Sequence, residues 1–404
     1  MANFDVISRL ATAEGGKILL LVMDGLGGLP REQGGLTELE TARTPNLDRL
    51  AREGSTGLSI PTLRGVTPGS GPAHLALFGY DPLVHEIGRG VLEATGIGLE
   101  VNPGDVAIRG NFCHIDENGL ITDRRAGRIS TEEGAKRIAL LKEISLPGVK
   151  IDIEIAKEYR FAMVLRGEGL SDAVADTDPQ RTGVEPLAAQ ALDPAAEKTA
   201  KLINQWLGEA RKRLKGHDPA NMVTLRGFAN EPGLPKYADV YKLKAACVAV
   251  YPMYRGVARL VGMDTIETTA HDTTEDEFRR VAKIWNQYDF VFCHVKYTDS
   301  RGEDGDFDAK VKVIEGVDQA LPILLDLKPD VLIVTGDHST PATYKAHSWH
   351  PVPTLLWAPG THMTGRAQSF GERECLFGAL GQFPATDLMP LALAHARRLE
   401  KFGA

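Results

Sequence analysis

Four short runs of almost continuous apolar residues recur along the chain, each bounded by polar or turn-forming residues. They cover residues 17–23, 290–296, 331–335 and 352–357. Strands that are buried on both faces of a parallel sheet show this pattern, because no face of the strand meets water. We therefore predict four buried parallel strands.

The segments between these runs have a helical pattern of apolar positions. Residues 44–54 begin with Thr44 as a capping residue and Pro45 at the first helical position, and they end at Gly54, as helices commonly do. Residues 275–285 and 310–327 predict two further helices. Strands and helices thus alternate at both ends of the chain, which indicates one open α/β domain.

The middle of the chain has a different pattern. Residues 111–122 alternate around Asn118-Gly119, a strong signal for a β-hairpin. Strands expected near 159–165 and 222–225 flank an amphipathic helix at 195–214. Since 404 residues exceed what one core usually serves, we expect a discontinuous first domain (1–95 and 264–404) and an inserted α+β domain (96–263).

Charge and cysteine content exclude several classes of protein. The chain has 46 basic and 54 acidic residues, a net charge of −8, which argues against a nucleic-acid partner. The four cysteines form no CxxC pair, so we expect reduced, mostly buried thiols. The first apolar run is too short for a signal peptide or a membrane span, and Asp24 follows it directly. We therefore expect a cytoplasmic protein with no membrane partner.

Potential metal ligands follow three of the predicted strands. Asp24 follows the first strand, Asp299 the second, and Asp337-His338 the third, while His347 lies in the connection to the fourth. Ligands gather at the carboxyl ends of strands in open α/β sheets. A single carboxylate there is usually just a polar residue at the end of a strand. Three carboxylates and two imidazoles together, however, would be costly to bury without cations. Mixed oxygen and imidazole ligands suit Mn²⁺, Zn²⁺, Co²⁺ or Fe²⁺ better than Ca²⁺.

A serine adds a candidate nucleophile. Residues 67–74 form a Gly- and Pro-rich loop that leads into an apolar helix, which places Ser70 near a helix N-terminus. Free N–H groups and the helix dipole favour a phosphate there, and a metal ion would lower the pKa of the hydroxyl. The ordinary alternative is that Ser70 caps the helix, and one residue could do both.

Several blocks of the sequence resemble the archaeal-type, cofactor-independent phosphoglycerate mutases of the alkaline phosphatase superfamily. The blocks lie at residues 23–25, 68–82, 109–112, 123–128, 166–172, 254–259, 335–341 and 347–353. The metal-ligand blocks alone would indicate only the superfamily, and the Arg-rich blocks narrow it to mutases. The resemblance implies an alkaline-phosphatase-like doubly wound sheet domain with a smaller inserted domain that orients the substrate.

The resemblance also implies an activity. Ser70 would take the phosphoryl group of 3-phosphoglycerate, and glycerate would take it back on its 2-hydroxyl, an isomerase reaction of glycolysis that needs no 2,3-bisphosphoglycerate. Two divalent ions (Mn²⁺, Co²⁺, Mg²⁺ or Zn²⁺) are implied. One would lie with Asp24, Ser70, Asp337 and His338, and the other with Asp299, His347 and a residue near position 303.

The same resemblance suggests how a small phosphorylated acid would bind. Planar guanidinium groups bind phosphate and carboxylate in bidentate fashion, and a single arginine is more often a solvated surface residue. Asp123 is the candidate acid/base and His114 a phosphate ligand. The other candidate substrate-binding residues are Arg124, Arg125, Arg128, Arg255, Arg259 and Lys296.

Two positions depart from the family pattern. Glu303 stands where a histidine is expected, and His350 stands where Asp or Asn is expected. Our hypothesis is that Glu303 binds the second metal ion and His350 restores an imidazole in or beside that site. Alternatively, Glu303 faces solvent and the second ion binds weakly. The sequence also leaves open a phosphatase or other phosphomutase, a catalytically impaired binding homologue, and whether the chain forms a homo-oligomer.

Overall fold

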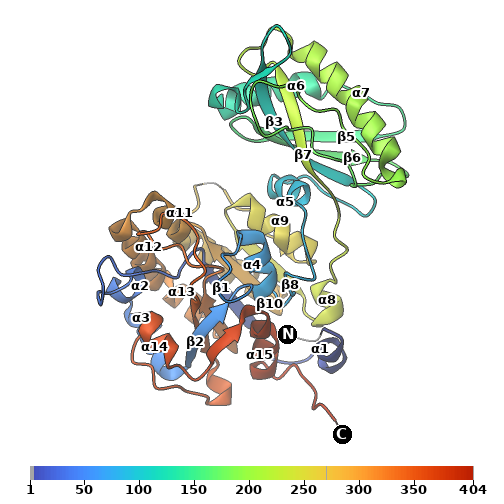
Figure 1. Cartoon of the computed structure of the whole chain (residues 1–404). Helices are drawn as coiled ribbons and strands as arrows, with labels where there is room; N and C mark the ends of the chain where they lie inside the picture. Colours follow the sequence, from blue (N-terminus) through green and yellow to red (C-terminus); the bar gives the residue numbers. More distant parts are fainter. Residues whose placement is uncertain (1–3, 270, 404) are drawn as a thin grey trace. The chain divides into compact units, whose positions relative to one another are not determined.

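A computed structural model of the chain describes residues 4–269 and 271–403 (Figure 1). It divides into two compact units. The first joins the residues up to Glu86 with those from Leu234 onward, and the second is Ile87–Gly233.

The first unit contains an eight-stranded sheet in the order β13-β2-β12-β11-β1-β10-β8-β9. All four predicted strands are present, as β1, β10, β11 and β12. Parallel pairing joins β11, β1, β10 and β8 at the centre. The strands are β1 (Ile18–Met23), β2 (Ser55–Ile60), β8 (Ala245–Ala249), β9 (Asp264–Thr265), β10 (Phe290–Val295), β11 (Val331–Thr335), β12 (Val352–Trp357) and β13 (Gly381–Pro384).

The prediction that the fourth strand is parallel was wrong. β12 pairs antiparallel with both β11 and β2. A parallel return needs a crossover, usually a helix, whereas residues 336–351 form an irregular connection without one. This connection therefore stays at the edge of the sheet where β11 ends, and it carries His347 there.

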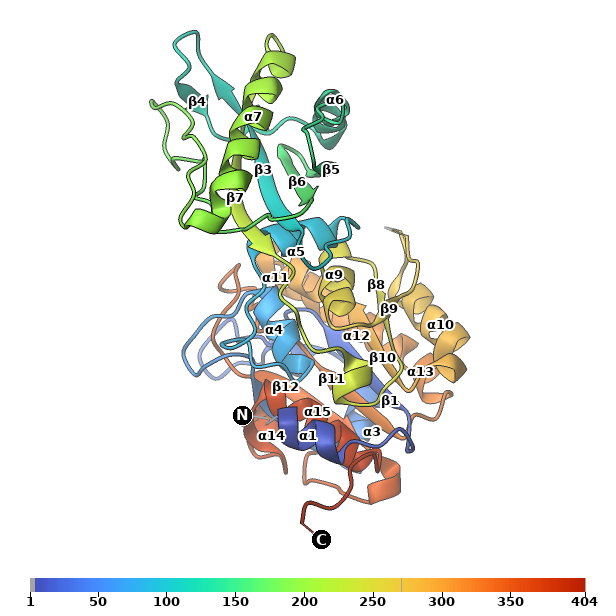
Figure 2. The same ribbon diagram turned by 90° about the vertical axis from the view of Figure 1, so that its right-hand side faces the viewer.

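Helices cover both faces of this sheet (Figure 2). On one face, β1, β10 and β11 share a core with α3, α10 and α12. On the other, Phe78 after α4 packs on Phe292, and Tyr237 of α8 packs on Phe290. The predicted doubly wound α/β fold is thus confirmed. The helices of this unit are α1 (Phe4–Leu10), α2 (Glu38–Thr41), α3 (Pro45–Glu53), α4 (Ser70–Leu77), α8 (Tyr237–Val240), α9 (Pro252–Leu260), α10 (Thr274–Ile284), α11 (Tyr297–Asp304), α12 (Phe307–Ala320), α13 (Pro322–Leu325), α14 (Glu372–Leu376) and α15 (Leu388–His395).

One predicted helix is interrupted. Residues 310–327 form the end of α12 and the separate short helix α13. The interruption lies at Pro322, the first residue of α13. Proline lacks the N–H that would continue α12, and its ring clashes with the preceding turn.

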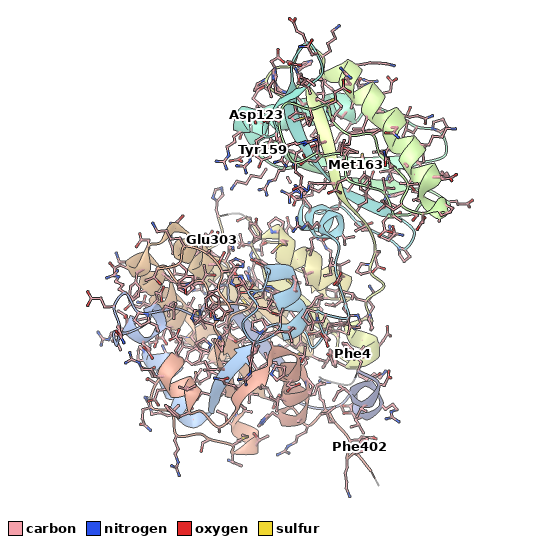
Figure 3. All side chains as sticks on the ribbon, viewed as in Figure 1. Phe4, Asp123, Tyr159, Met163, Glu303 and Phe402 are labelled. Carbon is pink, nitrogen blue, oxygen red and sulfur yellow. The ribbon has the colours of Figure 1, made fainter. Side chains whose placement is uncertain are left out.

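The second unit is an antiparallel sheet in the order β4-β3-β6-β5, with β7 also paired to β3. The Asn118-Gly119 turn joins β3 to β4 as predicted, with Gly119 at a φ of +81°. The helices α6 and α7 share a core with the sheet that includes Phe161, Trp206 and Met163, the last of which is labelled in Figure 3. The elements are α5 (Arg89–Gly96), β3 (Val106–Ile115), β4 (Ile121–Asp123), α6 (Thr131–Leu141), β5 (Lys150–Lys157), β6 (Arg160–Arg166), α7 (Glu197–Leu214) and β7 (Met222–Asn230).

The boundaries between the units differ from the expected 95/96 and 263/264. Residues 234–263 belong to the first unit, because β8 pairs with β10 in the main sheet. β8 reads Ala-Ala-Cys-Val-Ala, a short run whose small residues do not stand out as a strand. In turn, α5 belongs to the second unit, where Gly90 lies so close to the backbone of β3 that a Cβ would come within 2.3 Å of the Ala107 carbonyl oxygen.

All four cysteines are buried, free thiols, as expected. Among the described residues, no helix has both the length and the apolar character needed to cross a membrane.

Candidate active site

Three of the predicted ligands form a buried cluster at the carboxyl edge of the main sheet. Ligand atoms of Asp24, Asp337 and His338 all lie within 4.8 Å of one another. His338 Nε2 lies 3.5 Å from Asp24 Oδ1 and 3.1 Å from Asp337 Oδ2. The hydroxyl of Ser70 lies 3.3 Å from the same Nε2. The four residues predicted for one metal ion therefore converge on one point.

The parallel register of the sheet explains this convergence. Met23 at the end of β1 is level with Val295 at the end of β10, so the residues that follow both strands meet. Gly25 has a φ of +61°, and a Cβ there would lie 2.5 Å from Thr340 Oγ1 and 2.9 Å from Asp299 Oδ1. Only glycine fits at this point, which lets the loops from three strands close around the cluster.

The charges of the first cluster fit a cation. Asp24 Oδ1 and Asp337 Oδ2 are buried and have no hydrogen-bond partner among the described residues. Burial, with Asp337 beside it, raises the pKa of Asp24 from 3.8 to about 7, and burial raises that of Asp337 to about 6. Burial also lowers the pKa of His338 to about 3, so its imidazole is neutral. Two carboxylates and a neutral imidazole form a donor set that favours a divalent ion such as Mn²⁺ or Zn²⁺.

A second cluster shares His338 with the first. It joins Asp299, His338 and His347. His347 Nε2 lies 3.6 Å from Asp299 Oδ1, and the His338 and His347 rings stack with their centroids 3.6 Å apart. Burial alone would raise the pKa of Asp299, but Lys296 and the hydrogen bonds it receives leave that pKa below its ordinary value. Asp299 is therefore ionised.

The two departures from the family pattern lie in different surroundings. Glu303 is four residues after Asp299 on α11, on the same face, and its Oε1 lies 3.9 Å from His347 Nε2. Its side chain is 54% exposed, at the surface of the first unit (Figure 3). His350 stacks on Trp349 and shares a hydrogen bond with Ser348, and it is not among the described groups that converge on a ligand point. Of the two, Glu303 is the one beside the second cluster.

Ser70 is the first residue of α4, and Gly69 is the N-cap, with no side-chain cap. The expectation that Ser70 also caps the helix was therefore wrong; its hydroxyl faces His338 instead. Among the described residues, the N–H groups of Ser70 and Gly71 donate no hydrogen bond within the chain. Pro72 follows with no N–H, so the start of α4 offers two free donors beside the cluster.

Sequence reasoning missed several residues that surround the first cluster. His74 Nδ1 lies 2.8 Å from the Ser70 carbonyl oxygen and 3.3 Å from Asp337 Oδ2. Tyr254 donates to Asp24 Oδ2 at 2.5 Å, and His294 packs on the Tyr254 ring. The spacing of four residues between Ser70 and His74 on one helix face was the available signal.

Lys296 was predicted to bind substrate, and the structure places it between the clusters. Its Nζ donates to Asp24 Oδ2 at 2.9 Å and to Asp299 Oδ2 at 2.5 Å. Burial would lower the pKa of Lys296, but the two carboxylates outweigh it and raise that pKa. A cation therefore already lies between the two acidic groups.

The predicted arginines of the first unit share one face of α9. Arg255 donates to Thr268 Oγ1 at 2.9 Å, and Arg259 donates to Thr265 Oγ1 at 3.1 Å. Among the described residues, neither forms an ion pair with a carboxylate. Burial and the neighbouring Arg259 lower the pKa of Arg255. The pair thus carries positive charge with no carboxylate paired to it in the part of the chain that the structure describes.

The predicted residues of the second unit lie near β4 and the loop after it. Asp123 accepts hydrogen bonds from the backbone N–H of Arg125 at 2.7 Å and of Gly127 at 2.6 Å. Arg124 binds Asp178 through two nitrogens, at 3.2 and 2.9 Å. Arg125 and Arg128 are exposed. Arg124 is thus anchored, and Asp123 shapes the loop that presents the other two arginines.

Other contacts of the second unit bear on substrate binding. His114 lies 3.3 Å from Asp218 Oδ1 and shares a hydrogen bond with Thr122. Arg109 lies in one of the family-like blocks but was given no role from the sequence; burial and the neighbouring Arg160 and Arg226 lower its pKa. Their clustering across β3, β6 and β7 depends on strand register, which the sequence does not reveal.

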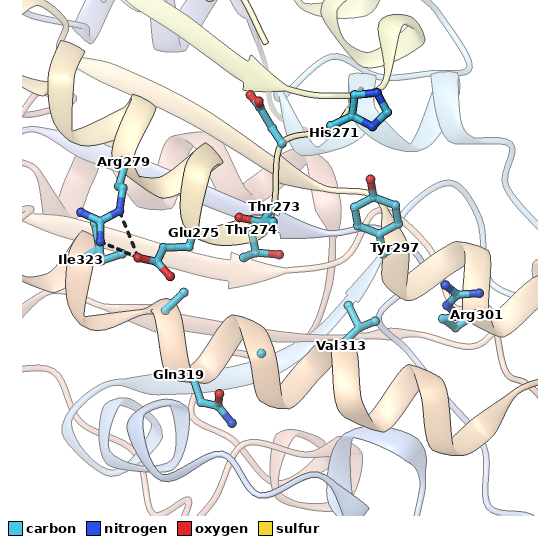
Figure 4. Close-up of a pocket in the computed structure, with 13 residues that line it drawn as sticks. His271, Thr273, Thr274, Glu275, Arg279, Tyr297, Arg301, Val313, Gln319 and Ile323 are labelled. Atoms are coloured by element: carbon cyan, nitrogen blue, oxygen red, sulfur yellow. Dashed lines mark hydrogen bonds and ion pairs between the residues drawn. The ribbon is translucent and has the colours of Figure 1, made fainter. Parts of the chain in front are cut away.

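A cavity of about 790 Å³ has a lining that includes His271, Tyr297 and Arg301 (Figure 4). Residues of α10, α11, α12 and α13 line it, and none of the predicted ligands does. Its Glu275 and Arg279 pair with each other at 2.5 Å. Since its charged groups pair rather than converge, the cavity does not compete with the metal-ligand clusters as an active site.

Comparison with known proteins identifies relatives of this chain. A family model described as "2,3-bisphosphoglycerate-independent phosphoglycerate mutase" matches residues 51–221. A probable mutase of that name from Thermosipho africanus is 54% identical over 401 residues, covering 99% of this chain and 98% of the relative. One from Aquifex aeolicus is 50% identical over 409 residues, covering 99% of this chain and 100% of the relative.

A solved structure shares the fold. The cofactor-independent phosphoglycerate mutase from Thermoplasma acidophilum superposes with a TM-score of 0.78 at 30% identity, covering 94% of this chain and 100% of the other. The relatives match nearly the whole chain, both units included. The chain therefore belongs to the family of 2,3-bisphosphoglycerate-independent phosphoglycerate mutases.

Proposed function

We propose that this protein interconverts 3-phosphoglycerate and 2-phosphoglycerate through a phosphoserine at Ser70. The observation that carries the proposal is the position of the Ser70 hydroxyl, 3.3 Å from His338 Nε2 and beside Asp24 and Asp337. A helix cap or a purely structural serine would not need two buried carboxylates and an imidazole at its hydroxyl. As a glycolytic enzyme, the protein would act in the cytoplasm.

Two divalent metal ions are part of the proposal, with Mn²⁺, Co²⁺, Mg²⁺ and Zn²⁺ as candidates. The buried carboxylate oxygens of Asp24 and Asp337 that lack a partner support the first ion. The first set of ligands would be Asp24, Ser70, Asp337 and His338, and the second Asp299, His347 and Glu303. When bound, the ions would lower the pKa of the Ser70 hydroxyl and offset the charge of the phosphoryl oxygens.

The chain's own residues would carry the transfer. The Ser70 hydroxyl gives up its proton and its oxygen attacks phosphorus, the bond from phosphorus to the substrate's C3 oxygen breaks, and that oxygen takes up a proton to give glycerate. The 2-hydroxyl of glycerate then loses its proton and attacks the phosphoserine, the bond from phosphorus to the Ser70 oxygen breaks, and that oxygen takes up a proton, which restores Ser70. The free N–H groups of Ser70 and Gly71 would bind phosphoryl oxygens in both steps.

Arginines in both units would bind the substrate. Arg255 and Arg259, which lack an acidic partner, suit a phosphate or a carboxylate. In the second unit, Arg124, Arg125, Arg128 and His114 would bind and orient glycerate, and Asp123 would exchange protons with its hydroxyls. Lys296 would contact the phosphoryl group once metal ions neutralise its two carboxylates.

The test is an enolase-coupled assay of 3-phosphoglycerate conversion by the purified protein, with no 2,3-bisphosphoglycerate, after chelation and after adding back each metal. We expect activity that chelation abolishes and one or more of the four ions restore. Activity that requires 2,3-bisphosphoglycerate, or that survives chelation, would contradict the proposal. Release of inorganic phosphate in place of 2-phosphoglycerate would identify a phosphatase instead, since water would then be taking the phosphoryl group.

A further inference from the structure

Thr340 lies where the two ligand clusters meet and belongs to neither. It is fully buried, three residues after Asp337. Its Oγ1 lies 2.7 Å from Asp299 Oδ1, in the second cluster, and 3.0 Å from His338 Nδ1, on the histidine that both clusters share. One hydroxyl therefore contacts a ligand of each predicted ion.

The direction of the two hydrogen bonds follows from counting protons. Asp299 Oδ1 accepts from the Thr340 hydroxyl, and this uses the only proton that the hydroxyl has to give. The bond to His338 then requires Nδ1 to carry a proton that it donates to Thr340 Oγ1. An imidazole that binds a metal ion is neutral and binds through the nitrogen that carries no proton. With the proton on Nδ1, that nitrogen is Nε2, which faces Asp24, Asp337 and Ser70.

The backbone of Thr340 also forms hydrogen bonds on both its N–H and its carbonyl. Its N–H donates to the Gly27 carbonyl at 3.0 Å, and its own carbonyl accepts from Lys310 Nζ at 2.8 Å. The fully buried Lys310 also donates to the carbonyls of Gly25 and Gly27, which uses all three of its donors. A Cβ on Gly302 would lie 2.3 Å from the Thr340 carbonyl oxygen. The backbone of Thr340 is therefore fixed beside both clusters.

We propose that Thr340 is a positioning residue that couples the two metal sites: it fixes the tautomer of His338 and the orientation of Asp299, so that both ions depend on one hydroxyl. The inference rests on the two-metal site of the proposed function. Partners of this kind tune metal affinity because they orient a ligand and set which nitrogen is free. A side chain that only filled space would affect neither ion.

The test compares Thr340→Val, which keeps the shape and removes the hydroxyl, with Thr340→Ser, which keeps the hydroxyl. Thr354→Val is the matched control, because Thr354 is equally buried and hydrogen-bonded, to Thr335 at 2.8 Å, but contacts no predicted ligand. Metal-free protein would be titrated with Mn²⁺ by calorimetry. Cobalt-loaded protein would give a visible spectrum of the ligand geometry, and urea unfolding of the metal-free protein would measure stability.

We expect wild type, Thr340→Ser and Thr354→Val to bind two Mn²⁺ ions with similar affinity. Thr340→Val should bind both ions about 10- to 100-fold more weakly, with a changed cobalt spectrum and a stability close to that of Thr354→Val. Wild-type affinity for both ions in Thr340→Val, or weakening of one ion alone, would overturn the coupling while leaving the proposed function standing. Failure of wild type itself to bind two ions would instead overturn both.

Discussion

The two ligand clusters share His338 but differ in how the chain holds them. In the first, Asp24 directly follows β1 and Asp337 lies two residues after the end of β11. Both are fully buried and are contacted by Tyr254 and His74. In the second, His347 comes from a long connection and its side chain is 23% exposed, and Glu303 is 54% exposed. Rigid, buried ligands favour tight binding, whereas open ligands leave room for exchange and for substrate. We therefore expect the first ion to be held firmly and the second to be the exchangeable one.

Ser70→Ala should have the largest effect on activity. It tests the chemistry of the first cluster separately from the ability of that cluster to hold a metal ion. We expect mutase activity to fall by about 1,000-fold or more, since the nucleophile is lost, while the other three ligands retain the ion. The measurements are the enolase-coupled rate and the metal content after dialysis. A variant that keeps appreciable activity would show that another group takes the phosphoryl.

Asp24→Asn tests whether the buried cluster is the tight one. Removing a ligand should cost more than the roughly 10- to 100-fold that outer partners contribute, so we expect at least about 100-fold weaker binding of the first ion. Calorimetric titration with Mn²⁺ measures it. If only the weaker of the two binding events changes, the assignment of tight and exchangeable sites is reversed.

Arg255→Met tests a residue outside both clusters. A hydrogen bond to a charged group contributes about 1.5–3 kcal/mol, so we expect the KM for 3-phosphoglycerate to rise about 10- to 100-fold. Metal binding should stay unchanged, because Arg255 contacts none of the ligands. Steady-state kinetics at saturating Mn²⁺ measure this, and a fall in metal content would contradict the separation of roles.

The raised pKa of Asp24 predicts how the metal-free protein responds to pH. Its pKa is 3.8 ordinarily and about 7 in the fold, so between these values the folded state keeps a proton that the unfolded chain loses. This contribution to stability is present below about pH 4 and is lost as pH rises towards 7. Burial lowers the pKa of His338, which gives the opposite dependence, and burial raises the pKa of Asp337 to about 6, which gives the same dependence as Asp24. Comparing Asp24→Asn with wild type removes the part of these contributions that the two proteins have in common.

We therefore compare the free energies of unfolding of Asp24→Asn and wild type. The difference, variant minus wild type, should rise by on the order of 1 kcal/mol between pH 5 and pH 8. Urea unfolding in the presence of a chelator measures the difference. A difference that does not change with pH would mean that Asp24 is ionised without metal. Saturating Mn²⁺ should remove the wild-type loss at high pH, because the ion replaces the proton.

Glu303→Gln should have the smallest effect and addresses the open cluster. Because the Glu303 carboxylate is half exposed and 3.9 Å from His347 Nε2, we expect only about 3- to 10-fold weaker binding of the second ion. The exposed Glu32, replaced by Gln, is a control for loss of a surface charge. Equal effects of the two variants would support the alternative that Glu303 faces solvent.

The sequence predicted most of what the parallel strands impose. Asp24, Asp299 and Asp337 meet because β1, β10 and β11 are parallel neighbours, and each strand was recognisable as an apolar run. The antiparallel β12 was missed because a buried strand looks the same in either direction. β8 was missed because its alanines resemble a helix as much as a strand.

The residues that support the ligands were harder to predict. Lys310 has the pattern of an exposed helix residue, yet it is fully buried against three backbone carbonyls, and nothing local in the sequence marks that. The distance between Glu303 and His347 depends on how the connection after β11 folds. Arg109 and Arg226 become neighbours only through the register of β3 and β7.

The most direct test of the account is to locate the transferred phosphoryl group. Metal-loaded protein would be mixed with 3-phosphoglycerate, quenched in acid within a turnover, digested and analysed by mass spectrometry, with Ser70→Ala alongside. We predict one phosphoryl group on Ser70 in the wild type and none in Ser70→Ala. Phosphate on a different residue, or none on the wild type under conditions in which it forms 2-phosphoglycerate, would contradict the account.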